Sequence, residues 1–102
     1  MALVSYSEHA LRDFERLFDF LARNDASLAG VVVSAIVEAV SVLERHPEIG
    51  RPAEQGLREL VISRRRTGYV ALYSFNSVTD TVLILALRHQ KEAGYPEAIG
   101  EI

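Results

Sequence analysis

The chain has 102 residues, of which 49% are hydrophobic and 25% charged, and this composition predicts one globular domain with a single core. The net charge of −3 disfavours general coating of nucleic acid, and the absence of cysteine excludes disulfides and thiolate metal sites. No charge-free apolar run approaches the roughly 18 residues that span a bilayer, and no secretory signal is visible, so we expect a cytoplasmic protein without a membrane partner.

The charge is unevenly distributed along the chain. Residues 1–50 carry eight acidic and four basic side chains, residues 51–91 carry three acidic and seven basic ones, and the tail from Glu92 adds three acids. A basic segment between two acidic ones is typical of a local anion site rather than of an extended nucleic-acid surface.

The first third of the chain predicts a short strand followed by a helix. Leu3–Tyr6 reads as a strand, and Ser7 fits the N-cap of a helix from about Glu8 to Arg23. The apolar residues of this helix recur at helical spacing and form one face: Ala10, Leu11, Phe14, Leu17, Phe18 and Leu21. The charged residues are expected on the opposite face: Arg12, Asp13, Glu15, Arg16 and Asp19.

The second helix is unusually apolar. Asn24 or Asp25 caps a helix from about Ala26 to Arg45, and His46-Pro47 ends it. Its polar residues form one narrow stripe: Ser34, Glu38, Ser41 and Arg45. A helix this apolar has to cover more than one surface, either the first helix and a sheet together, or a core and a partner.

Three strands follow a loop over residues 48–56. The expected strands are Leu57–Ile62, Tyr69–Phe75 and Thr81–Leu87, with a hairpin loop at Asn76–Asp80 between the last two. The tail, residues 92–102, is expected to be irregular or a short helical turn. Consecutive helices followed by consecutive strands predict an α+β fold, β-α-α-β-β-β, with a helical hairpin on one face of a twisted, mainly antiparallel sheet.

Two basic clusters border the strands. Arg64, Arg65 and Arg66 precede one hairpin, and Arg88-His89-Gln90-Lys91 follow it. Because a hairpin returns its end close to its start, we expect the clusters to be neighbours and to face phosphates or carboxylates. The alternative is a solvated hairpin rim.

The side chains permit acid–base chemistry at this end more readily than metal chemistry. His9, His46 and His89 lie in different elements without ligand spacing, and the isolated turn glycines Gly68 and Gly94 make no phosphate loop. Cutting RNA without metal needs a base, cations and an acid. The basic clusters supply cations, His89 titrates near neutrality, and Tyr95 could act as an acid or a stacking ring.

Each of these residues also has a structural interpretation. His89 could simply bond a backbone carbonyl at a strand end, and Tyr95 could pin the tail to the sheet. Tyr69 and Tyr73 could pack in the core with outward hydroxyls. The residues alone leave both sets of interpretations open.

Four segments in this order resemble the RelE/ParE toxin superfamily over nearly the whole chain, as one domain over residues 1–102. They are residues 4–14, His46–Pro52, Gly68–Tyr73 and Ile84–Glu92. The resemblance implies the toxin of a type II toxin–antitoxin system of plasmid-stabilisation type, which inhibits growth and uses no cofactor. It also implies neutralisation by an antitoxin, for which we expect a surface on the second helix at Val33, Val37 and Val40, with a homodimer or a heterotetramer as the assembly.

The family divides by mechanism. ParE-like members poison DNA gyrase, and for them we expect target binding by Arg64, Arg65, Arg66, Arg88 and Lys91. RelE-like members cut mRNA in the ribosome, and for them the catalytic candidates are His89, Arg65, Arg88 and Tyr95. Nucleases of the family commonly have an arginine where this chain has Val70 and a further basic residue where it has Gln90, so the gyrase interpretation is preferred. A non-toxic binding module of the same fold is the third alternative.

Overall fold

The computed structural model of the protein describes residues 1–64 and 67–91, with the side chains of Ser63, Arg64 and Thr67 excepted. The elements are β1 (Leu3–Tyr6), α1 (Glu8–Ala22), α2 (Ala26–Ser41), β2 (Arg51–Pro52), β3 (Arg58–Arg64), β4 (Thr67–Asn76) and β5 (Thr81–His89). Two short 3-10 turns are also present, η1 (Val42–Glu44) and η2 (Glu54–Gly56).

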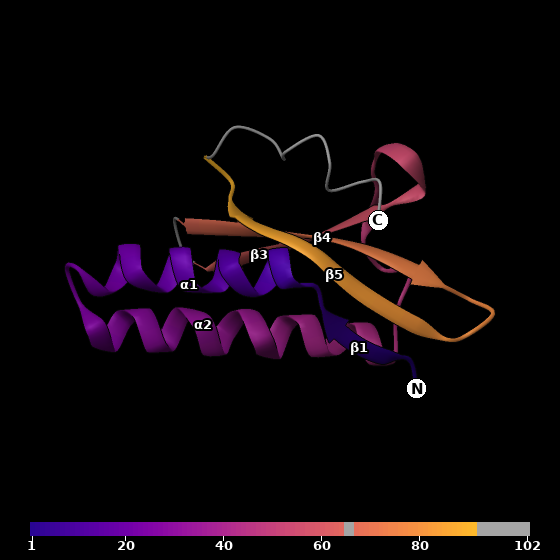
Figure 1. The fold of residues 1–102 in the computed structure, drawn as a ribbon, viewed down its shortest axis with the longest axis horizontal. Helices are drawn as coiled ribbons and strands as arrows, with labels where there is room; N and C mark the ends of the chain where they lie inside the picture. Colours follow the sequence, from indigo (N-terminus) through magenta and orange to yellow (C-terminus); the bar gives the residue numbers. More distant parts are fainter. Residues whose placement is uncertain (65–66, 92–102) are drawn as a thin grey trace.

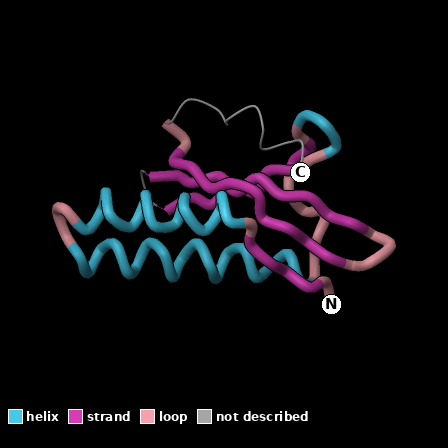
Figure 2. The backbone as a smooth tube through the Cα atoms, in the orientation of Figure 1, coloured by secondary structure: helices cyan, strands magenta, loops and turns pink. Residues whose placement is uncertain are grey.

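The molecule has two layers, a five-stranded sheet and a helical hairpin that covers one of its faces (Figure 1). The strand order is β1-β5-β4-β3-β2, in which β1 runs parallel to β5 and the other pairs are antiparallel. Figure 2 shows α1 and α2 lying side by side along the sheet, while the β4–β5 turn extends beyond them. The predicted α+β fold with a mainly antiparallel sheet is confirmed.

Both helices begin at the caps that the sequence predicted. The Ser7 Oγ accepts a hydrogen bond from the Ala10 backbone N–H at 3.1 Å. Asp25 Oδ1 accepts from the N–H groups of Ser27 and Leu28 at 3.0 and 3.2 Å. The second helix ends earlier than expected, at Ser41, because the following residues tighten into η1.

The core lies between α2 and the helix-facing side of the sheet. Its largest fully buried side chains include Ile36 of α2, Tyr73 of β4, and Ile84 and Leu87 of β5. Tyr69 and Tyr73 are core residues, in agreement with their structural interpretation, but the Tyr73 hydroxyl does not point outward. The hydroxyl is buried, and its oxygen accepts a hydrogen bond from the Gly50 N–H at 2.9 Å.

Several local features differ from the sequence predictions. The short strand β2 was expected to be part of a loop. A register shift opposite Leu72–Tyr73 leaves Leu85 of β5 as an extra residue, which is the arrangement of a β-bulge. Gly68 lies inside β4 and not in a turn. The predicted tail, residues 92–102, lies outside the described residues.

The apolar character of the second helix is also visible in the structure. By length and composition alone, one described helical segment, Ala26–Glu44, would suffice to cross a membrane, a test that the core helix of a soluble protein also passes. In this fold Ala29, Val32, Ile36 and Val40 of that segment are buried within the protein.

Candidate functional site: the basic end of the sheet

The two basic segments lie at the same end of the sheet. Arg64 is paired with Thr67 across the β3–β4 turn, and the Gln90 N–H donates to the Gly68 carbonyl at 2.9 Å. Two strand spacings, about 10 Å, therefore separate the end of β3 from the residues that follow β5. The predicted proximity is confirmed for these segments, whereas Arg65, Arg66 and Tyr95 lie outside the described residues.

Gln90 and Gly68 also contact each other through the Gln90 side chain. The Gln90 carboxamide occupies the space that a Cβ at position 68 would need. A Cβ at position 68 would therefore have to displace the end of the Gln90 side chain. The contact joins the end of β5 to the start of β4.

Arg88 and His89 point to opposite faces of the sheet. Directly paired residues share a face, and Arg88 pairs with Val70 while His89 pairs with Tyr69. The His89 ring packs edge-on against the Tyr69 ring at 5.3 Å, on the face that the helices cover. Its Nδ1 accepts from the Lys91 N–H at 3.0 Å. The two candidates therefore cannot converge on one reacting group from this strand.

Arg88 is partly buried within an ion-pair network. Its side chain is 16% exposed, and one guanidinium nitrogen lies 3.8 Å from Glu59 Oε2. Arg51 donates to Glu59 Oε1 at 3.0 Å, so one carboxylate lies between two arginines. Arg58 donates to the Glu48 and Gly50 carbonyls at 3.1 and 2.9 Å. Arg51 and Arg58 thus fasten the loop before β3, and Lys91 is an exposed cation at the end of β5.

Side chains of α1 form hydrogen bonds with the backbone of β5 beyond the end of β1. Asp13 was expected on the solvent face, but this prediction is wrong because Asp13 is only 8% exposed. Its Oδ2 accepts from the Leu87 N–H at 2.8 Å, and Arg16 donates to the Leu87 carbonyl at 3.3 Å. The helical spacing contained the signal for this burial, since Asp13 follows Ala10 by three residues and precedes Leu17 by four.

Apolar side chains are exposed on the outer surface of the helical hairpin. Val37 is 47% exposed and Val33 is partly exposed. Val40, which was assigned to the same surface, is 1% exposed and packs in the core, so it is not available to a partner in this structure. On α1, Leu11 and Phe18, which were expected on its apolar face, are 53% and 39% exposed.

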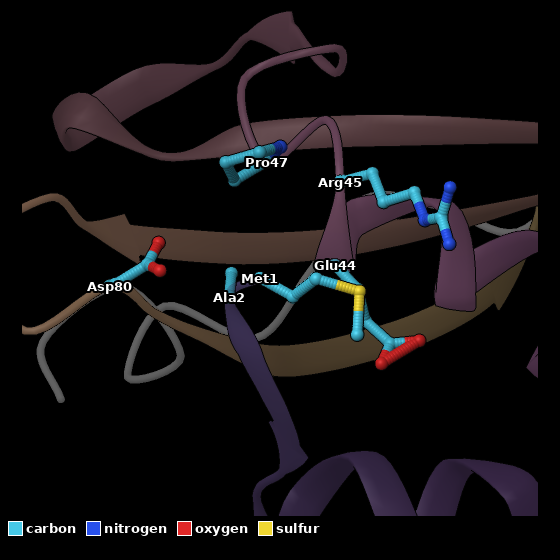
Figure 3. Close-up of a pocket in the computed structure, with 6 residues that line it drawn as sticks. All are labelled: Met1, Ala2, Glu44, Arg45, Pro47 and Asp80. Carbon is cyan, nitrogen blue, oxygen red and sulfur yellow. The ribbon is translucent and has the colours of Figure 1, made fainter.

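A shallow, open pocket lies at the N-terminal end of β1, away from the basic end (Figure 3). The Ala2 N–H donates to the Glu44 carbonyl at 2.8 Å, and the Leu3 N–H donates to the Asp80 carbonyl at 3.0 Å. The Arg45 guanidinium and the Asp80 carboxylate lie on opposite sides of the pocket. Among residues 1–64 and 67–91, no three histidine or acidic side chains gather as a metal site.

Comparisons with known proteins agree on one family. Residues 4–94 match the family described as the ParE toxin of the type II toxin–antitoxin system parDE. Toxin RelE3 of Caulobacter vibrioides is 32% identical over 92 residues, which cover 90% of this chain and 98% of that toxin.

Solved structures of toxin–antitoxin systems share the fold. The chromosomal ParDE system of P. aeruginosa aligns with a TM-score of 0.72 at 24% identity, covering 87% of this chain and 96% of that one. A chain of the RelBE2 toxin–antitoxin complex of Mycobacterium tuberculosis aligns with a TM-score of 0.63 at 28% identity, covering 87% and 98%. The RelBE complex of E. coli aligns with a TM-score of 0.58 at 14% identity, covering 90% and 100%.

Proposed function

The chain belongs to the ParE toxin family, within the RelE/ParE superfamily of type II toxins, and we propose that it arrests growth in the cytoplasm by binding DNA gyrase. The observation that carries this choice is the opposite orientation of Arg88 and His89. A metal-independent ribonuclease needs a base, cations and an acid around one phosphate. Arg88 and His89 do not offer that convergence.

The strand β4 supports the same choice. The position after Gly68-Tyr69, where ribonuclease relatives commonly have an arginine, is Val70 in this chain. Val70 is 1% exposed and therefore packs within the protein. The helix-covered face of β4 is likewise filled, by Tyr69, Ala71 and Tyr73. Neither face of this part of β4 presents a cation to a phosphate.

The target-binding surface in this proposal is the basic end of the sheet. It consists of Lys91, Arg88 and the β3–β4 turn with Arg64, Arg65 and Arg66. Lys91 is exposed, and Arg88 reaches the same end through the carbonyls of His89 and Gln90, to which it donates at 3.4 Å. A cationic surface of this kind accelerates association with an anionic partner and loses its effect as salt increases.

In a cell whose growth is not arrested, the proposed partner is an antitoxin that covers the helical hairpin. Val33 and Val37 lie four residues apart on α2, and Leu11 and Phe18 lie seven apart on α1, so each pair forms an apolar row. All four side chains are at least partly exposed. The ParDE and RelBE relatives were solved as toxin–antitoxin systems, which supports such a partner here. Self-association of the isolated toxin would use the same surface.

A RelE-like activity, ribosome-dependent cleavage of mRNA, is the second candidate. It is favoured by the similarity to two relatives above 25% identity, toxin RelE3 and a chain of the RelBE2 complex. In that case His89 would act with Arg65, Arg88 or Tyr95, and residues outside the described part of the chain would have to complete the site.

Purified toxin and purified gyrase test the proposal. We expect the wild type to inhibit DNA supercoiling, and the double variant Arg88→Ala/Lys91→Ala to inhibit about tenfold more weakly. Arg12→Ala is the matched control, since it removes an exposed arginine of α1. Full inhibition by the double variant would contradict the assigned surface. No inhibition by a folded wild type, together with growth arrest in cells, would support the second candidate; the absence of growth arrest would indicate a non-toxic binding module.

A further inference from the structure

Among the described residues, one edge of β5 loses its neighbouring strand near the residues assigned to target binding. β1 pairs with β5 only from Leu3↔Thr81 to Tyr6↔Ile84, so no strand covers this edge from Leu85 onward among the described residues. An uncovered edge leaves backbone N–H and C=O groups without ladder partners. In this protein α1 covers that edge.

Beyond the end of β1, three side chains from the N-cap and the middle of α1 hydrogen-bond the exposed edge of β5. After the Ser7 N–H donates to the Ile84 carbonyl at 2.9 Å, the Ser7 Oγ donates to the Leu85 carbonyl at 3.2 Å. The Leu87 N–H then donates to Asp13 Oδ2, and Arg16 donates to the Leu87 carbonyl. We call Ser7, Asp13 and Arg16 the edge clamp.

Asp13 is the central member of the edge clamp. Besides the Leu87 N–H at 2.8 Å, its two carboxylate oxygens meet an Arg16 guanidinium nitrogen and His9 Nε2, each at 3.4 Å. A carboxylate that is nearly buried needs such partners to balance its lost hydration. The side chain is therefore held from both sides and offers Leu87 an acceptor at a fixed position.

The edge clamp acts at a position where β5 needs it. The bulge at Leu85 interrupts the β4–β5 register just before the basic end, and bulged strands bend and twist locally. Downstream of the bulge, β4 holds one edge of β5 through pairs such as Val70↔Arg88, and Asp13 holds the other edge at Leu87. Leu87 is the residue directly before Arg88.

We infer that Asp13 is a positioning residue for the toxin's target surface. Through Leu87 it fixes the direction in which the end of β5 presents residues 88–91. This inference rests on the proposed function, since it takes the end of β5 as the surface that meets the target. Asp13 itself does not touch the target. Loss of its carboxylate frees the Leu87 N–H and lets the strand end move relative to the β3–β4 turn.

Growth inhibition by full-length variants, together with amide hydrogen exchange, tests this inference. For Asp13→Ala we expect exchange at Leu87 and at residues 89–91 to accelerate about ten- to a hundredfold, with little change in β3 and α2, because a buried N–H loses its only side-chain acceptor in the clamp. Toxicity per folded molecule is expected to fall about tenfold or more. Asp13→Asn keeps an acceptor oxygen for the Leu87 N–H and is expected to retain most of the toxicity that Asp13→Ala loses.

Three controls separate positioning from general destabilisation and from the proposed function. Ile36→Val weakens the core beneath α2, and Asp19→Ala removes an exposed carboxylate of α1; both are expected to leave toxicity unchanged while the protein stays folded. If Ile36→Val reduces toxicity as much as Asp13→Ala does, the positioning role is overturned. If Arg88→Ala/Lys91→Ala remains fully toxic, the proposed surface fails. If that double variant loses toxicity while Asp13→Ala keeps it, only the positioning inference fails.

Discussion

Replacing Gly50 by alanine probes the contact that ties the loop before β2 to the centre of the sheet. A Cβ on Gly50 would lie 2.6 Å from the Tyr73 Oη, 2.7 Å from its Cε1 and 2.8 Å from the Glu59 carbonyl oxygen. The Glu59 oxygen belongs to the backbone of β3, and the Tyr73 ring is fully buried, so neither neighbour can withdraw easily. The alanine therefore has to displace the loop itself.

The expected cost follows from two terms. Overpacking of a well-packed site costs about 1–3 kcal/mol. Moving the loop also breaks the buried hydrogen bond from the Gly50 N–H to the Tyr73 oxygen, which costs a further ~1–3 kcal/mol. We expect Gly50→Ala to lower the free energy of unfolding by roughly 2–6 kcal/mol, a large share of the roughly 5–15 kcal/mol typical of a domain.

Urea unfolding of Gly50→Ala, followed by circular dichroism, measures this loss, and Gly30→Ala provides the matched control. Gly30 lies within α2, and a Cβ there meets no atom within 4 Å. The same substitution is therefore expected to stabilise the protein by about 0.5–1 kcal/mol, because alanine restricts the unfolded chain and favours helix. If Gly50→Ala costs less than about 1 kcal/mol, the close approach of the loop to Tyr73 is wrong.

Three further predictions concern the α2 cap, the antitoxin surface and alkaline stability. Asp25→Ala removes the acceptor for the N–H groups of Ser27 and Leu28 and should cost about 1 kcal/mol in urea unfolding; an unchanged midpoint would contradict the cap. Val37→Asp should leave the melting temperature nearly unchanged but reduce co-purification with the co-expressed antitoxin about tenfold or more, and undiminished co-purification would count against this surface. Burial raises the pKa of Tyr73 above its ordinary value near 10, so folding favours the neutral phenol. The stability that this provides is fully present below pH 10 and is lost as the pH rises through the higher folded-state pKa. Urea titrations at increasing alkaline pH should show a fall in the free energy of unfolding, and Tyr73→Phe should make this fall shallower. An identical slope in both proteins would refute the assignment.

Local patterns predicted most of the fold. Helical spacing and the hydroxyl or carboxylate caps at Ser7 and Asp25 suffice to start both helices, because these signals lie within a few residues of one another. The strand β2 could not be predicted in this way. It consists of Arg51 and Pro52 alone, and only its pairing with β3 defines it as a strand. The bulge at Leu85 likewise exists only as a relation between two strands.

The candidate site likewise combines features that local patterns predict with features that depend on residues far apart in sequence. The proximity of the two basic segments followed from hairpin geometry, and the opposite faces of Arg88 and His89 would have followed from strand alternation. The burial of Arg88 beside Glu59 depends on side chains from β3 and β5 that are far apart in sequence. The burial of Asp13 was not predicted because a charged side chain on a helix usually faces solvent, although Asp13 lies between two buried residues of α1.

The most direct test of the proposed function is to induce the wild-type protein in a host cell and to map two products in the same culture, gyrase-linked DNA breaks and the 5′ ends of ribosome-bound mRNA. Binding of gyrase by the toxin predicts growth arrest with gyrase-linked breaks and no new 5′ ends at fixed positions within translated codons. Growth arrest with cleavage within codons on the ribosome, and without gyrase-linked breaks, would contradict it.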